Sequence, residues 1–292
     1  MDEMNEAAPL APTDAEQLSG ELSAAQRLLN REVKLRRDVL KPLEIALKAL
    51  KDPHRNAVAL YEASTALEQT PPELTLPENF AATTEQLRAL ADEKLSDLEF
   101  TFARDLRAAF QDNGIELSGP PHELIADLFV LRVDMRRRLV DMTFSRQPVS
   151  AKKIKLDVAQ VVTAYERAWR DICERKVDLD KLLAELYEAC GRVLKLSGKT
   201  AGTRTSLLDV YRELIMVRQP AGFRKNPSKN SFVDYPKAHF IYDLLQLRRQ
   251  QKTECEGHRL NFGTATISET SRALFLATGA TEGQFIKDLY FS

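Results

Sequence analysis

The most constraining feature of this 292-residue sequence is a run of apolar residues at helical spacing between residues 83 and 111. Spacings of three and four residues place one set of side chains on a single face of an α-helix. That set is Leu87, Ala91, Leu95, Leu98, Phe102, Leu106 and Ala109. A straight amphipathic helix of this kind buries its apolar face against a core or a partner. We expect Thr84 to cap its start and Gly114 to end it in a left-handed conformation.

The same spacing predicts helices through most of the chain. The expected ranges are 15–50, 53–68, 121–142, 153–176, 179–196, 206–217 and 236–252. Pro42 lacks an amide hydrogen and should kink or divide the first of them near Leu40. Asp178 is a suitable N-cap for the helix that follows it. The sequence contains only 11 glycines, and tight turns consume glycine, so the expected fold class is mainly α.

The periodicity changes near the C-terminus, where three short segments are enriched in Thr, Ile and Phe. We expect residues 259–267, 273–277 and 284–291 to form a small antiparallel sheet. Three helices followed by such strands resemble a winged-helix arrangement in outline. In that arrangement one helix enters the major groove of DNA and a hairpin touches the backbone. The recognition helix would then lie within residues 237–252.

These patterns suggest a division into three parts. Residues 1–14 are acidic and aperiodic, which predicts a disordered tail. Residues 15–145 are expected to form a helical bundle that mediates protein contacts, with long amphipathic helices. Residues 150–292 are expected to form a basic helical domain with terminal β-strands. The boundary is placed at the SRQPVS segment, residues 145–150, close to a change in the sign of the charge.

The net charge of −1 conceals a strong asymmetry. Residues 1–130 carry 13 Lys and Arg against 24 Asp and Glu, whereas residues 131–260 carry 27 against 16. A concentrated positive field attracts polyanions such as nucleic acids. Alternatively, the two halves neutralise each other across an internal interface. The sequence leaves both interpretations open.

Motifs for catalysis or metal binding are weak. The SGKT segment, residues 197–200, lacks the glycine spacing and preceding strand of a phosphate-binding loop. Cys255 and His258 have the spacing of half a zinc site, but no second half-site follows. No nucleophile elbow is present. We therefore expect no metal or cofactor and favour a non-enzyme, although an active site assembled from scattered residues stays possible.

The pattern of cysteines and apolar runs bears on the compartment. Three widely spaced cysteines, Cys173, Cys190 and Cys255, are typical of reduced thiols in a cytoplasmic protein. The acidic N-terminal segment has no apolar run, and no stretch approaches the length of a transmembrane helix. We expect a cytoplasmic chain without a signal peptide and without a membrane partner.

Basic residues with interleaved aromatic residues carry the strongest functional signal. Phosphate oxygens are bound by cations, and exposed bases stack on aromatic faces. The candidate nucleic-acid-binding residues are Lys199, Arg204, Arg218, Arg224, Lys225, Lys229 and Lys237, with Phe223 and Tyr235. This set is extended by Lys152, Lys153, Lys155, Arg248 and Arg249. The competing interpretation is an ordinary solvated loop.

Two functions follow from these patterns. The first is a non-catalytic subunit of a larger complex that contacts DNA or RNA through its basic C-terminal loops. The alternative is a purely helical scaffold or adaptor, without nucleic-acid contact. Its N-terminal helices would bind a protein partner or self-associate, and an apolar stripe of Leu22, Ala25, Leu29 and Val33 supports that interpretation.

Overall fold

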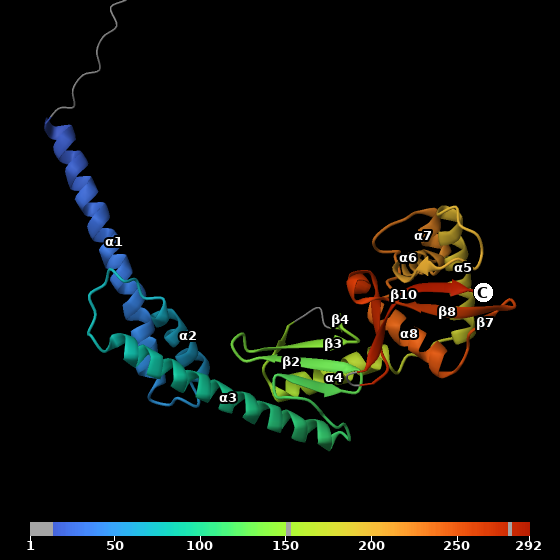
Figure 1. Cartoon of the computed structure of the whole chain (residues 1–292), viewed down its shortest axis with the longest axis horizontal. Coiled ribbons are helices and arrows are strands. Elements are labelled where there is room, and N and C mark those ends of the chain that lie inside the picture. Colours follow the sequence, from blue (N-terminus) through green and yellow to red (C-terminus); the bar gives the residue numbers. More distant parts are fainter. Residues whose placement is uncertain (1–13, 150–152, 280–281) are drawn as a thin grey trace, which may run out of the picture. The chain divides into compact units, whose positions relative to one another are not determined.

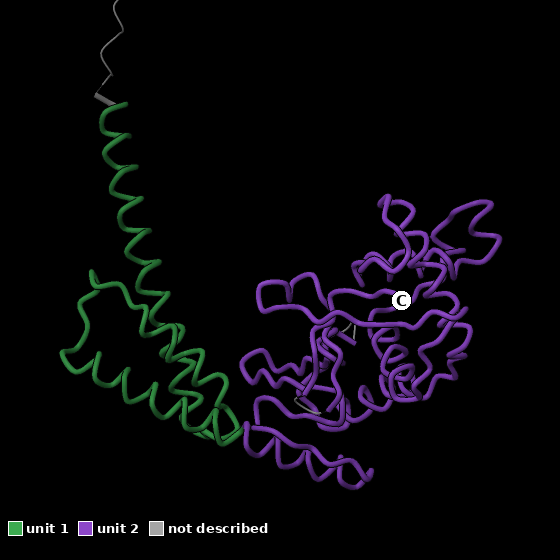
Figure 2. The backbone as a smooth tube through the Cα atoms, turned by 45° about the vertical axis from the view of Figure 1, so that its right-hand side comes forward, with its two compact units in different colours: residues 1–98 green, residues 99–292 purple. Residues whose placement is uncertain are grey.

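The computed structural model describes residues 14–149, 153–279 and 282–292. The described residues are 54% helix and 17% strand, which confirms the expected mainly α fold class (Figure 1). Its contacts divide it into two compact units, residues 1–98 and 99–292 (Figure 2). The expected tail lies outside the described residues except for Asp14, where the first helix begins.

The N-terminal unit contains three helical elements. They are α1 (Asp14–Ala49), α2 (Ala57–Glu68) and the first part of α3 (Phe80–Asp112). Ala46 on α1 and Leu67 on α2 belong to one buried cluster, and Leu60 on α2 and Ala91 on α3 belong to another. Arg88 of α3 ties these elements together, because its guanidinium donates hydrogen bonds to side-chain oxygens on α2.

One local expectation for this part of the chain was wrong and one was confirmed. Helix α1 is not divided at Pro42, whose ring is buried on the same side as Val39 and Ala46. Thr84 lies inside α3, where its hydroxyl donates to the carbonyl of Phe80 four residues earlier. Gly114 follows α3 with a φ of 73°, as a left-handed cap requires.

A five-stranded antiparallel sheet replaces the helix expected over residues 121–142. Its strands are β1 (Glu123–Ala126), β2 (Phe129–Asp134), β3 (Leu139–Phe144), β4 (Gln147–Pro148) and β5 (Ile154–Lys155). Leucines and methionines at helical spacing misled the prediction. The buried residues alternate instead, so that Phe129 pairs with Phe144 and Leu131 with Met142 on one face. The basic segment 136–138 belongs to the turn between β2 and β3.

Four of the remaining helices lie close to the expected positions, and they are α4 (Val158–Ile172), α5 (Leu179–Leu196), α6 (Leu207–Val217) and α8 (Lys237–Arg249). The short helix α7 (Ala221–Lys225) lies in a segment for which no helix was expected. Asp178 caps α5 by accepting a hydrogen bond from the Lys181 amide, as predicted. Helix α4 packs against the first sheet through aromatic rings, with the Tyr165 and Phe129 centroids 5.1 Å apart.

The predicted C-terminal sheet is present and antiparallel. It is formed by β6 (Thr205–Ser206), β7 (Glu254–Cys255), β8 (His258–Thr264), β9 (Leu274–Ala277) and β10 (Gly283–Phe291), with a 3₁₀ turn η1 (Ile267–Arg272) before β9. The strand order is β6-β10-β8-β7, and β9 also pairs with β10. Strand β10 is therefore the central strand, between β8 and the two short partners.

The two units divide after Leu98 rather than at residues 145–150. Ser145 is buried, and its hydroxyl donates to the Phe275 carbonyl and accepts from the Ala277 amide of β9. Arg146 lies over the Phe275 ring at 4.1 Å. The turn that we expected to form the domain boundary is thus fixed to the C-terminal sheet. Its last residue, position 150, lies outside the described residues.

Candidate nucleic-acid interface

The irregular segment 218–236 contains the short helix α7 and carries most of the predicted binding residues. Two of them have structural roles instead. The Nε atom of Arg218 donates to Glu185 at 2.7 Å, and its guanidinium lies 4.0 Å from the centre of the Tyr235 ring. Arg218 is therefore neutralised within the C-terminal unit. It was predicted as a phosphate ligand because sequence alone did not place Glu185 beside it.

Tyr235 is also unavailable to a base. It is 5% exposed, and its hydroxyl donates to Oδ2 of Asp243 at 2.6 Å. The other carboxylate oxygen of Asp243 accepts from Arg175, also at 2.6 Å. Burial raises the pKa of Asp243, while the hydrogen bonds from Tyr235 and Arg175 act to lower it. This buried network fixes α8 to the segment before it.

Arg224 and Phe223 are partly used by the fold. The Arg224 guanidinium donates to the backbone carbonyls of Val217 and Gln219, where α6 ends. It therefore satisfies carbonyls that a helix C-terminus leaves unpaired. Phe223 is half-buried and packs edge-on against Phe232, with ring centroids 5.6 Å apart. Neither residue presents its whole side chain to a ligand.

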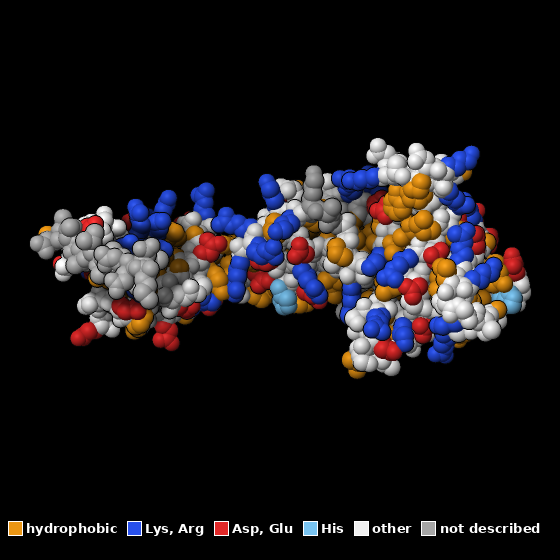
Figure 3. Space-filling view, turned by 90° about the horizontal axis from the view of Figure 1, so that it is seen from above, with side chains coloured by type: hydrophobic (Ala, Val, Ile, Leu, Met, Phe, Trp, Pro, Cys, Tyr) orange, Lys and Arg blue, Asp and Glu red, His pale blue; other side chains and the backbone are white. Residues whose placement is uncertain are grey.

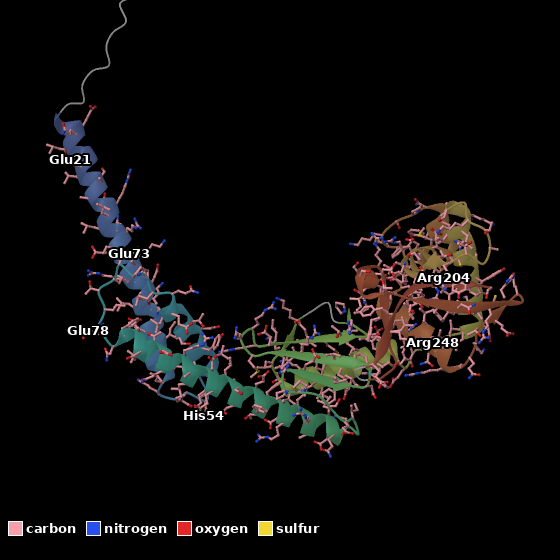
Figure 4. The ribbon with its side chains drawn as sticks, in the orientation of Figure 1. Glu21, His54, Glu73, Glu78, Arg204 and Arg248 are labelled. Atoms are coloured by element: carbon pink, nitrogen blue, oxygen red, sulfur yellow. The ribbon has the colours of Figure 1, made fainter. Side chains whose placement is uncertain are left out.

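Five predicted cations stay accessible. Lys199, Arg204, Lys225, Lys229 and Lys237 are exposed, and none forms an ion pair with a described residue. Lys237 opens α8, where the helix dipole adds positive potential. Arg204 lies 5.5 Å from the Tyr290 ring centre and is labelled in Figure 4. On the face in Figure 3, basic side chains of this unit are interspersed with acidic and hydrophobic ones.

An open groove of about 620 Å³ lies where the end of α8 meets the C-terminal sheet. By strand register, Leu260, Phe262 and Thr264 of β8 share one face with Ile286 of β10. Arg248 borders the groove from the last turn of α8, with its guanidinium 5.8 Å from the Phe262 ring centre (Figure 4). The sequence indicated Arg248 as a basic residue, but only strand pairing reveals the surrounding groove.

The potential metal and catalytic residues do not converge within the described ranges. Cys255 and His258 face each other across the β7–β8 turn, and His258 stacks on Tyr187. Burial raises the pKa of the Cys173 thiol to about 12, which disfavours the nucleophilic thiolate at neutral pH. No group of three metal-ligating side chains is found in residues 14–149, 153–279 and 282–292.

A second exposed surface lies on the N-terminal unit. Every described side chain from Glu16 to Lys34 is exposed, although the segment is helical. The apolar stripe predicted from sequence is part of it, with Leu22 71%, Leu29 62% and Val33 64% exposed. The side chains of this end of α1, which carries Glu21 in Figure 4, project away from the helix. We call residues 16–34 the α1 arm.

No family model, no curated protein and no solved structure matches this chain. Among the described residues, no helix is long and apolar enough to cross a membrane.

Proposed function

We propose that this chain is a non-catalytic subunit of a larger assembly and contacts nucleic acid through its C-terminal unit. The supporting observation is the set of exposed cations that lack acidic partners among the described residues: Lys199, Arg204, Lys225, Lys229 and Lys237. Basic side chains that have no partner within the fold are available to phosphate oxygens.

Charge follows the division into units and supports the same proposal. Residues 1–98 carry 11 Lys and Arg against 18 Asp and Glu, whereas residues 99–292 carry 31 against 25. The positive excess therefore belongs to one compact unit. An excess of this size suits contacts with phosphates and raises the encounter rate with a polyanion, without specifying a base sequence.

The proposed interactions are with the backbone of the nucleic acid rather than with its bases. We propose a winged-helix-like arrangement, because α5, α6 and α8 are followed by the β8 and β10 pair. Seven of the 13 residues of α8 are buried, however, including Phe240 and Leu244. A helix so deeply packed has few side chains for the edges of bases in a groove.

The direct test is a salt-titrated binding assay of the full chain with labelled single- and double-stranded DNA and RNA. The triple variant Lys225→Glu, Lys229→Glu and Lys237→Glu should weaken binding. It should also reduce the salt dependence, by about one unit of slope for each phosphate that is no longer bound. Arg224 is left unchanged, since its substitution would also disturb the end of α6.

A matched control separates this effect from net charge. Lys41, Lys48 and Lys51 are exposed residues at the end of α1 and just after it, and their reversal to Glu changes the charge equally. This control variant should bind with unchanged affinity and slope. Equal losses for both triple variants would attribute binding to net charge alone. Unchanged affinity of the first variant would remove the 225–237 segment from the proposal.

The second candidate function is that of a helical scaffold, and the α1 arm supports it. An isolated helix of 19 residues, about 28 Å long, is marginal in water without packing. Its exposed leucines and Val33 repeat at helical spacing, which suits the packing of a second helix. We propose that an apolar helix of a partner subunit covers this stripe.

The scaffold proposal is tested by replacing Leu22, Leu29 and Val33 with Gln, which keeps the charge of the arm. Partners that co-purify with the native chain should be lost from this variant, and a control with Arg27, Arg31 and Lys34 changed to Gln should retain them. Light scattering of the purified chain measures its oligomeric state and tests whether a second copy of the chain covers the stripe instead. A dimer that the apolar variant abolishes would assign the stripe to a second copy.

A further inference from the structure

The groove at the end of α8 contains an arginine without a counterion. The Nη1 atom of Arg248 is fully buried, and no described residue accepts a hydrogen bond from it. No ion pair of Arg248 with a described acid is present either. Buried polar groups are almost always paired, and a buried charge is usually matched by an opposite one. Arg248 as a whole is only half-buried and lines the groove, so the positive charge that the fold leaves unmatched is open to an anionic ligand there.

Other buried or half-buried arginines of the same unit emphasise the contrast. Arg175 donates to Asp243 and Arg218 donates to Glu185, so the fold neutralises each of these guanidinium groups. Arg248 occurs on the same helix as Asp243 but lies in its last turn, at the border of the groove. A carboxylate thus pairs with each of these two arginines, whereas no described carboxylate forms an ion pair with Arg248.

The remaining groove residues suit a phosphate group. Arg259 is exposed, forms no ion pair with a described residue, and is held in place because its backbone pairs with Ser292. Thr264 and Gln284 line the same groove and offer neutral hydrogen-bond donors. Glu254 also lines the groove, is exposed and lies opposite Arg259 in the register of β7 and β8, so its carboxylate repels an anionic ligand at the rim. Phe262 provides an apolar surface beside Arg248.

We infer that this groove binds a phosphate group of a nucleic acid strand, with Arg248 and Arg259 as the ligands of its oxygens. The planar guanidinium fork matches phosphate geometry through paired hydrogen bonds. This inference rests on the proposed function, because it names a phosphate subsite for the same class of ligand. The same two guanidinium groups could also bind free phosphate or the phosphate of a mononucleotide, and the experiment distinguishes these ligands from a nucleic acid strand.

The experiment compares Arg248→Gln with Arg167→Gln in the full chain. Arg167 is an exposed residue of α4 in the same unit and outside the candidate binding set, so both variants lose one positive charge from that unit. A strand of about 15 nucleotides should bind Arg248→Gln about tenfold or more weakly, whereas Arg167→Gln should stay within about twofold of the native affinity. Arg248→Lys should fall between them, because it keeps the charge and loses the fork.

Stability measurements guard against an unfolded variant. Arg248 makes no hydrogen bond or ion pair that the substitution could break within the described residues, and the contact that it loses is the one with the Phe262 ring at 5.8 Å. The melting temperature of Arg248→Gln should therefore fall only slightly. Parallel titrations with inorganic phosphate and with adenosine monophosphate identify the source of the phosphate group. Affinity for these two ligands should be at least about tenfold weaker than for the strand.

The outcomes distinguish the groove from the wider function. Suppose that the native chain binds the strand and that the Lys225, Lys229 and Lys237 variant binds it more weakly. Equal affinities of Arg248→Gln and Arg167→Gln would then overturn the groove inference and leave the proposed function intact. If the native chain binds no nucleic acid, the proposed function fails. In that case, if the native chain binds adenosine monophosphate and Arg248→Gln abolishes this binding, the phosphate group does not come from a nucleic acid strand. If neither ligand binds, the inference of a phosphate site in the groove is overturned as well.

Discussion

Helices α1 and α8 carry similar apolar patterns and have opposite surroundings. Leu22 and Leu29 of α1 are 71% and 62% exposed, whereas Leu244 and Leu247 of α8 are fully buried. Spacing therefore predicts that a segment is helical, but it does not say whether the stripe faces a core. Buried leucines stabilise the fold, while exposed leucines at the same spacing indicate a surface that another chain can cover.

The largest expected effect comes from breaking the buried network around α8. Asp243→Ala removes the acceptor of both Tyr235 and Arg175. It leaves the half-buried Arg175 without its counterion and the buried Tyr235 hydroxyl without its acceptor. We expect the free energy of unfolding to fall by about 3–5 kcal/mol, measured by urea denaturation.

The matched change on the surface is Glu188→Ala. Glu188 pairs with Arg192 on the exposed side of α5, and an exposed pair of this kind contributes about 0–1 kcal/mol. A loss of the same size in both variants would show that the Asp243 network does not organise the C-terminal unit.

A second prediction concerns the two kinds of leucine in the N-terminal unit. Leu60 of α2 is fully buried and packs with Ala91 of α3, so Leu60→Ala should cost about 2–5 kcal/mol in unfolding free energy. Leu29→Ala should change it by less than about 0.5 kcal/mol, because the side chain has no packing to lose. A large destabilisation by Leu29→Ala at any protein concentration would indicate that the arm is packed within one chain.

The smallest predicted effect is a titration at the surface of the C-terminal sheet. Lys287 and the Thr266 cap lower the pKa of Glu269 to about 2. Because the folded pKa lies below the ordinary value of 4.5, this interaction stabilises the fold above that value and is lost as the pH falls towards 2. Carboxyl chemical shifts followed by NMR should report this pKa.

The companion variant for this measurement is Lys287→Gln. This variant should raise the titration midpoint of Glu269 towards the ordinary pKa, because the hydrogen bond from Lys287 is the largest cause of the lowered pKa. An unchanged midpoint would assign the shift to the Thr266 cap alone.

Local signals were reliable where a single pattern fitted the residues. Asp178 and Gly114 act as predicted because a cap depends on its immediate neighbours. The segment after Pro121 failed because its apolar residues satisfy two periods at once. Leu131 and Met142 fit helical spacing, yet alternation with Phe129, Val133 and Phe144 places them in strands. Pairing between strands decided between the two periods.

The candidate binding residues show the same difference between local signals and tertiary contacts. Lys225, Lys229 and Lys237 are exposed, as a polar basic segment indicates, because flexible cations favour water when no acid is near. Arg218 and Tyr235 were chosen for the same chemistry and lie inside the fold. Their partners, Glu185 and Asp243, are brought beside them by the packing of α5 and α8, which no spacing along the chain reveals.

The sequence by itself determined the mainly helical class, the positions of most helices, the C-terminal strands and the segregation of charge. These properties depend on neighbours within a few residues or on composition. Tertiary structure alone decided which basic side chains have acidic partners, which apolar stripe is buried, and that Arg248 borders a groove. These properties depend on contacts between residues far apart in the chain, and such contacts exist only once the elements have packed.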